Sequence, residues 1–174
     1  MNKKYPWKPL ITGVIVGLVS VGSSTIAESL DKHFDWGVPT AAIRWLTGLL
    51  TLVILGIGIY TGMRSIKKSN AGQLTYGQAF LAGFIIVLTA GLTVALASLV
   101  YRNVINPGYA AGMVAESKKA MAADGKSPAD IAAATASLEE QWSGGRLMVH
   151  FLIVLTVFGT ATTLVMGIFM KSKK

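Results

Sequence analysis

The chain has 174 residues, of which 52% are apolar and only 14% are charged, and its mean hydropathy is +0.56. This composition excludes an ordinary soluble domain and indicates an integral membrane protein. The net charge of +8 does not indicate a nucleic-acid-binding protein, because the cations stand beside apolar runs and not on a soluble basic face. The absence of cysteine excludes disulfides, thiolate metal sites and cysteine nucleophiles.

Two apolar runs occupy the first third of the chain. The first, residues 10–27, follows a basic flank with Trp7, which is typical of a first transmembrane helix. A signal peptide cleaved after Ala27 would share this pattern, but the apolar run exceeds the usual length, so we expect it to be retained. A polar connection is expected over residues 28–40. The second run, residues 45–63, follows Arg44, whose long side chain can extend to the head groups.

The third apolar run carries its own start and stop signals. Thr75 and Gln78 have the spacing of a capping box, which predicts a helix that begins near residue 76. Residues 79–100 are uncharged and would form a helix about 33 Å long, matching a hydrocarbon core of about 30 Å. The residues Asn106, Pro107 and Gly108 cannot extend a helix. The sequence therefore predicts a transmembrane helix over residues 76–100.

The only long polar segment, residues 102–146, separates the third run from the fourth. It divides at Asp124 and Gly125 into two helix-compatible halves, and the second half begins with Ser127 as N-cap and Pro128 in the first turn. One face of this half is apolar: Ile131, Ala134, Leu138 and Trp142. A helical hairpin is therefore predicted over about residues 107–143, followed by a fourth span over residues 147–170.

Charge sorting predicts the orientation. The N-terminus, the connection after the second run and the C-terminal tail hold nine cations and no acid, whereas the two opposite connections hold seven cations and all eight acids. The positive-inside rule places the first set in the cytoplasm. We expect one all-α membrane domain over residues 1–174: a four-transmembrane-helix bundle with both termini cytoplasmic and an extracytoplasmic helical hairpin between helices 3 and 4. The basic rim should attract anionic lipids.

The motif LTYGQAF at residues 74–80, then Gly83, and then YRNVINP at residues 101–107 give the chain a family likeness. With these residues in this layout, the chain resembles the DUF4199 family of small bacterial membrane proteins of unknown function. The resemblance covers the whole chain. It implies a bacterial protein, and therefore the inner membrane, and it brings no catalytic residue to carry over.

Small residues recur at a spacing of four in every apolar run. Such residues let helix backbones approach closely where no hydrophobic force drives association, although glycine and alanine are also simply common in membrane helices. The spacing GxGxxxG around Gly58 lies inside an apolar run and does not follow a strand, so it indicates packing and not a dinucleotide site. The expected packing residues are Gly13, Gly17, Gly58, Gly62, Ala79, Gly83, Gly91, Ala95, Gly159, Thr163 and Gly167.

Two side chains are candidates for a functional or pore-facing role. His150 lies within the fourth apolar run, about one turn from its outer end, and an intramembrane histidine is a functional candidate. At that depth it can also reach interfacial water or Arg44, and this structural role is favoured over proton relay. His33 with Glu28, Asp31 and Asp35 could form a metal site, but a solvated polar loop is favoured, because a second histidine is missing.

These features predict a structural or accessory membrane subunit that acts through helix packing and partner binding, the partner being a membrane protein or another copy of the chain. No catalytic, cofactor or metal site is expected, because no acid, base, nucleophile or metal cluster converges, so an enzyme is the least favoured reading. A small channel or transporter is the alternative, although no carboxylate or proline interrupts a span. Its pore would be lined by Thr89, Thr93, Thr156, Thr160 and Thr163.

Overall fold

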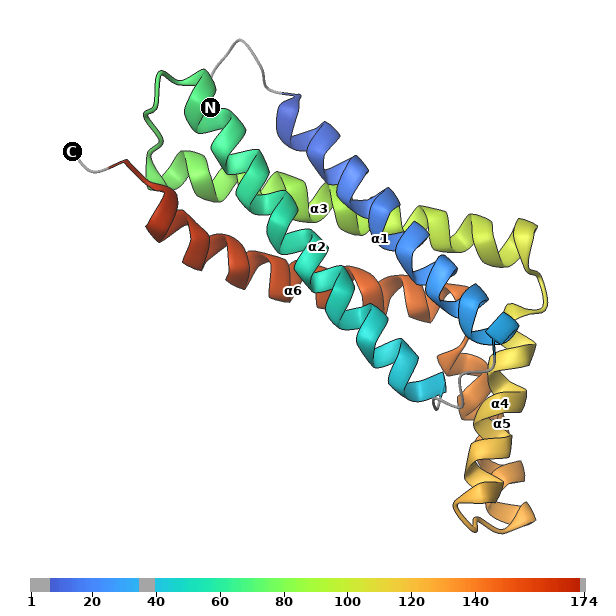
Figure 1. The fold of residues 1–174 in the computed structure, drawn as a ribbon. Coiled ribbons are helices and arrows are strands. Elements are labelled where there is room, and N and C mark those ends of the chain that lie inside the picture. The colour runs from blue at the N-terminus through green and yellow to red at the C-terminus, as the bar shows by residue number, and fades with distance from the viewer. Residues whose placement is uncertain (1–6, 35–39, 173–174) are drawn as a thin grey trace. The chain divides into compact units, whose positions relative to one another are not determined.

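The computed structural model describes residues 7–34 and 40–172, apart from some side chains near residues 28–44 and 144–147. Across these residues the chain forms helices and turns and no strand (Figure 1). The elements are α1 (Lys8–Phe34), α2 (Thr40–Ser69), α3 (Tyr76–Val100), the π-helix η1 (Tyr101–Ile105), α4 (Tyr109–Ala123), α5 (Pro128–Gln141) and α6 (Gly144–Met170).

Four of these helices are long and apolar enough to cross a membrane. The qualifying segments are Lys8–Ala27, Trp45–Ser69, Tyr76–Ile105 and Met148–Met170. Large apolar side chains cover their outer surfaces; on α2, for example, Leu49, Val53 and Ile57 are each more than half exposed. Such surfaces are stable in contact with lipid. The predicted fold class, an all-α membrane protein with four spanning helices, is confirmed.

Two helices extend beyond their apolar runs. Helix α1 continues to Phe34, so residues 28–34 of the expected polar connection are helical. These residues contain no glycine or proline, so nothing stops the helix at the end of the apolar run. Helix α2 likewise continues through Arg64, Lys67 and Lys68 to Ser69, because lysine and arginine are good helix formers.

The predicted capping box starts α3. The backbone N–H of Gln78 donates to Thr75 Oγ1 at 3.2 Å, and the backbone N–H of Thr75 donates to Gln78 Oε1 at 3.1 Å. Both bonds satisfy amides that the first turn of a helix leaves without partners. The predicted limits of this helix, residues 76 and 100, agree with the structure.

The chain divides into two compact units, Met1–Val94 with Leu152–Lys174, and Ala95–Phe151. In the first unit the helices alternate in direction, so the start of α1, the end of α2, the start of α3 and the end of α6 lie at one end (Figure 1). Polar bonds join the helices there: Lys8 Nζ donates to Ser69 Oγ at 2.7 Å, and Lys67 Nζ donates to the Met170 carbonyl at 3.0 Å. The cations Lys8, Arg64, Lys67, Lys68 and Lys171 therefore gather at this end.

Ser172 fastens the segment after α6 to the α2–α3 connection. Its backbone N–H donates to the Leu74 carbonyl at 2.8 Å, and its hydroxyl accepts from the Leu74 N–H at 2.9 Å. The same hydroxyl donates to the Gly72 carbonyl at 3.0 Å. We call these three bonds the Ser172 clasp. The connection that these bonds hold is well packed, since the Leu74 side chain is 1% exposed.

Glycine on α1 permits direct contact with α3. A Cβ added at Gly13 would lie 2.6 Å from Thr89 Cβ and 2.8 Å from the Ile86 carbonyl oxygen. One helical turn later, a Cβ at Gly17 would lie 2.6 Å from Thr93 Cβ. No side chain fits at these distances, so the two helices touch through the glycine backbone.

The same kind of contact joins α3 to α6. A Cβ at Gly83 would lie 2.5 Å from Thr163 Cγ2, and a Cβ at Gly159 would lie 2.6 Å from Val87 Cγ2. The other predicted packing residues also lie at helix contacts or are buried: Gly58 against Val16, Gly62 against Ile86, Gly91 against Leu152, Gly167 against Tyr76, and Ala79 and Ala95 with no exposed surface.

Candidate functional site

The second unit, Ala95–Phe151, begins with a change of helix type. Helix α3 passes without a break into η1, whose i→i+5 bond runs from the Asn106 N–H to the Tyr101 carbonyl at 2.6 Å. Pro107 follows and prevents a further turn. A π-helical turn widens the helix locally, and such turns occur frequently at functional sites.

Arg102 of the widened turn contacts a tyrosine ring, which in turn meets a second tyrosine. Arg102 Cζ lies 4.7 Å from the ring centroid of Tyr109, a cation–π distance. The rings of Tyr101 and Tyr109 meet edge to face, with centroids 5.9 Å apart and planes at 76°. These contacts fix the start of α4, because Tyr109 is its first residue.

Local signals then fold α4 and α5 into an adjacent pair. Gly125 has a φ of +77°, which glycine adopts without strain, and the N–H groups of Gly125 and Lys126 donate to the carbonyls of Ala122 and Met121. Ser127 caps α5 by accepting from the Asp130 N–H at 3.2 Å. The chain thus turns at Asp124 and Gly125, and α4 and α5 pack against each other.

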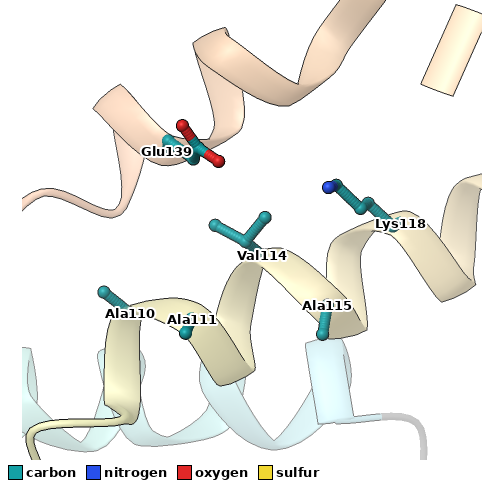
Figure 2. Close-up of a pocket in the computed structure, with 6 residues that line it drawn as sticks. All are labelled: Ala110, Ala111, Val114, Ala115, Lys118 and Glu139. Atoms are coloured by element: carbon teal, nitrogen blue, oxygen red, sulfur yellow. The ribbon is translucent and has the colours of Figure 1, made fainter. Parts of the chain in front are cut away.

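A pocket of about 370 Å³ lies between α4 and α5. Its lining consists of small apolar side chains with one cation and one carboxylate: Ala110, Ala111, Val114, Ala115, Lys118 and Glu139. Glu139 is the contribution of α5, and Figure 2 shows it across the pocket from Val114 and Lys118 of α4. Pockets that are mostly apolar with a few placed polar groups are the usual form of a binding site.

The charged groups of this pocket are not paired with each other. Among the described residues, Arg146 forms an ion pair with Glu140, with 2.9 Å between Arg146 Nη2 and Glu140 Oε1. It does not pair with the neighbouring Glu139. Neither Lys118 nor Glu139 has an ion-pair partner within the described part of the chain. Both charges therefore remain available to a group that enters the pocket.

The structure describes only some of the side chains that the sequence singled out as candidates. His150 is exposed, and its ring lies edge to face with Phe151 at 6.2 Å between centroids. The side chain of its expected neighbour Arg44 lies outside the described residues, as do those of Glu28, Asp31 and Asp35 near the exposed His33. Within the described ranges, no group of three histidine or acidic side chains could hold a metal.

Four of the five predicted pore threonines divide into two sets, and the fifth, Thr156 of α6, is half-buried. Thr89 and Thr93 pack directly against Gly13 and Gly17, as described above. The hydroxyls of Thr160 and Thr163 are buried and, within the described residues, have no hydrogen-bond partner. Most buried hydroxyls are hydrogen-bonded, so these two are notable polar atoms of the first unit.

Sequence reasoning missed the pocket and the arginine–tyrosine cluster. The position of Glu139 across the pocket from Lys118 depends on how two helices pack, and the intervening turn alone does not specify their rotation. The arginine–tyrosine cluster could have been suspected, because Tyr101 and Tyr109 stand on the two sides of the helix-ending Pro107 and can meet beside Arg102. The π-helical turn itself has no signal in the residue types.

Comparison with known proteins gives one match. A family model described as "Protein of unknown function (DUF4199)" matches residues 11–172, nearly the whole chain. The curated proteins and the solved structures contain no match to the chain. The matched range includes the η1 turn, the pocket, the apolar helices α2, α3 and α6, and α1 from Ile11 onward.

Proposed function

Because the chain belongs to the DUF4199 family, whose description names no activity, we propose a function from the geometry: an accessory membrane subunit, not an enzyme, that binds a partner through α4 and α5. The observation that carries the proposal is the pocket, which offers, beside small apolar side chains, a cation and a carboxylate that have no ion-pair partner among the described residues. Such a surface suits recognition of another molecule, because a partner gains both apolar contact and two charge contacts.

The first unit suits the role of an anchor. Its helices contact one another at glycines where a Cβ would collide, and such packing fixes helix positions in lipid. With the cations of the α1, α2 and α6 ends in the cytoplasm of a bacterial cell, α4 and α5 would lie on the outer side of the cytoplasmic membrane. The basic end would attract anionic lipids.

Affinity purification tests this function. The tagged chain is extracted from its native membranes in a mild detergent, and the co-purifying proteins are identified and quantified. We expect a stoichiometric partner with the unchanged chain and its loss with Ala115→Arg, which fills the pocket from an exposed position. Ala120→Arg, exposed on the same helix but outside the pocket lining, is the matched control and should retain the partner.

A channel is the second candidate, and the buried Thr160 and Thr163 hydroxyls favour it, because water in a pore would satisfy them. Reconstituted liposomes distinguish the two functions. Solute or ion flux that depends on Thr163, from a preparation without a stoichiometric partner, would replace the accessory function with the channel. The direct contact of Thr89 and Thr93 with α1 leads us to expect no flux.

A further inference from the structure

The two helices that form the pocket carry opposite charge. Helix α4 has two lysines and one glutamate, Lys118, Lys119 and Glu116, whereas α5 has three acids and no cation, Asp130, Glu139 and Glu140. Over residues 102–146 there are five cations and five acids, so this segment is neutral although the whole chain carries +8. A second copy of the segment would therefore meet it without net repulsion.

The pocket repeats this charge arrangement at close range. Lys118 comes from the basic helix and Glu139 from the acidic one; Val114 projects toward Glu139, and the other lining side chains are alanines of α4. Because these side chains are small, another helix can approach closely. A surface with one cation and one carboxylate is also complementary to itself: rotated by 180°, it presents each charge to its opposite.

We propose that the pocket binds a second copy of this chain, with the α4–α5 pairs of both copies packed about a two-fold axis so that Lys118 of each copy meets Glu139 of the other. This inference rests on the proposed function and names its partner. Two helix pairs packed in this way form a four-helix bundle. The 15 residues of α4 and 14 of α5 correspond to about 22 Å and 21 Å, so the two pairs can overlap along their whole length.

Charge reversal tests the proposal in the full-length chain. Two copies with different tags are co-expressed, extracted in mild detergent and scored for mixed dimers. Lys118→Glu in both copies places two acids at each contact, and Glu139→Lys places two cations there. Each should raise the apparent dissociation constant about tenfold, since two ion pairs are lost and replaced by repulsion.

The decisive experiment co-expresses the two single variants, one in each tagged copy. A copy with Lys118→Glu and a copy with Glu139→Lys again place opposite charges at both contacts, so the mixed dimer should recover wild-type affinity. The double variant in one chain should recover it too. If Lys118 and Glu139 act only within one copy, the double variant recovers but the mixture of singles does not, and this result would overturn the proposal.

Cross-linking provides a second measurement that leaves the charges intact. The chain has no cysteine, so Ala111→Cys introduces a single thiol into the pocket lining, and Ala120→Cys introduces one elsewhere on α4. With a short bismaleimide in native membranes, we expect Ala111→Cys to give a covalent dimer of this chain and Ala120→Cys to give little. A cross-link from Ala111→Cys to a different protein refutes the dimer and leaves the accessory function standing. With no cross-link at all, the dimer is refuted, whereas the affinity purification decides the accessory function, because a bismaleimide detects only partners that carry a thiol.

Discussion

Gly83 of α3 lies against Thr163 of α6 with no room for a side chain. A Cβ there would lie 2.5 Å from Thr163 Cγ2, 2.7 Å from Thr163 Oγ1 and 2.9 Å from Met63 Cε. Thr163 and Met63 are both fully buried, so neither can move aside easily. We expect Gly83→Ala to destabilise the protein by about 1–3 kcal/mol, as overpacking of a filled core does. Thermal unfolding of the detergent-solubilised protein measures the change.

Shortening Thr163, the residue that Gly83 contacts, should restore the stability lost in Gly83→Ala. In the double variant Gly83→Ala with Thr163→Ala, the colliding Cγ2 and Oγ1 atoms are gone, so most of the lost stability should return. Gly48→Ala on α2 is the control, because a Cβ there meets nothing within 4 Å, and alanine should leave stability unchanged or slightly higher. An equal loss of stability for Gly83→Ala and Gly48→Ala would contradict a steric origin.

At the scale of elements, the sequence predicts what local chemistry decides. The limits of α3 and the start of α5 follow from Thr75, Gln78 and Ser127, whose side chains bond amides within three residues. The ends of α1 and α2 were harder to predict, because hydropathy marks where the membrane stops and not where the helix does. The η1 turn was not predicted, since its single i→i+5 bond depends on how Tyr101 and Arg102 pack around Tyr109.

The Ser172 clasp is an element-scale contact with a direct test. Ser172→Ala removes the hydroxyl that accepts from the Leu74 N–H and donates to Gly72, but it keeps the backbone bond to the Leu74 carbonyl. Of the two bonds lost, the one from the Leu74 N–H is worth about 1 kcal/mol, so its loss should raise hydrogen exchange at the Leu74 amide about fivefold. Ser24→Ala is the control, since that hydroxyl bonds only the Ser20 carbonyl of its own helix. Equal exchange at Leu74 in both variants would show that the clasp does not protect the connection.

At the scale of the whole molecule, residue spacing predicts that helices touch but not which helices do. Each span has small residues four apart, yet only the packed structure pairs Gly13 with Thr89 or Gly159 with Val87. The same holds for the candidate site: the apolar face and turn of residues 107–143 were visible in the sequence, whereas the opposition of Lys118 and Glu139 required the rotation of α4 against α5. Contacts distant in sequence are set by the sum of many packing choices, which a local pattern does not contain.

Charge placement predicts how the molecule lies in its membrane. The described cations Lys8, Arg64, Lys67, Lys68 and Lys171 lie at one end of the first unit, and no acid of the sequence stands in the connecting and terminal segments of that end. Moving such a set across a membrane is strongly disfavoured, so this end should face the cytoplasm. Single thiols at Gln73 in the α2–α3 connection and Lys126 in the α4–α5 turn should report on the two sides, because both side chains are exposed and α3, which is long and apolar enough to cross a membrane, lies between them in the sequence. In intact bacterial spheroplasts, an impermeant maleimide should label Lys126→Cys, and should label Gln73→Cys only after permeabilisation. The reverse pattern would invert the orientation, and labelling of both in intact spheroplasts would contradict a crossing by α3.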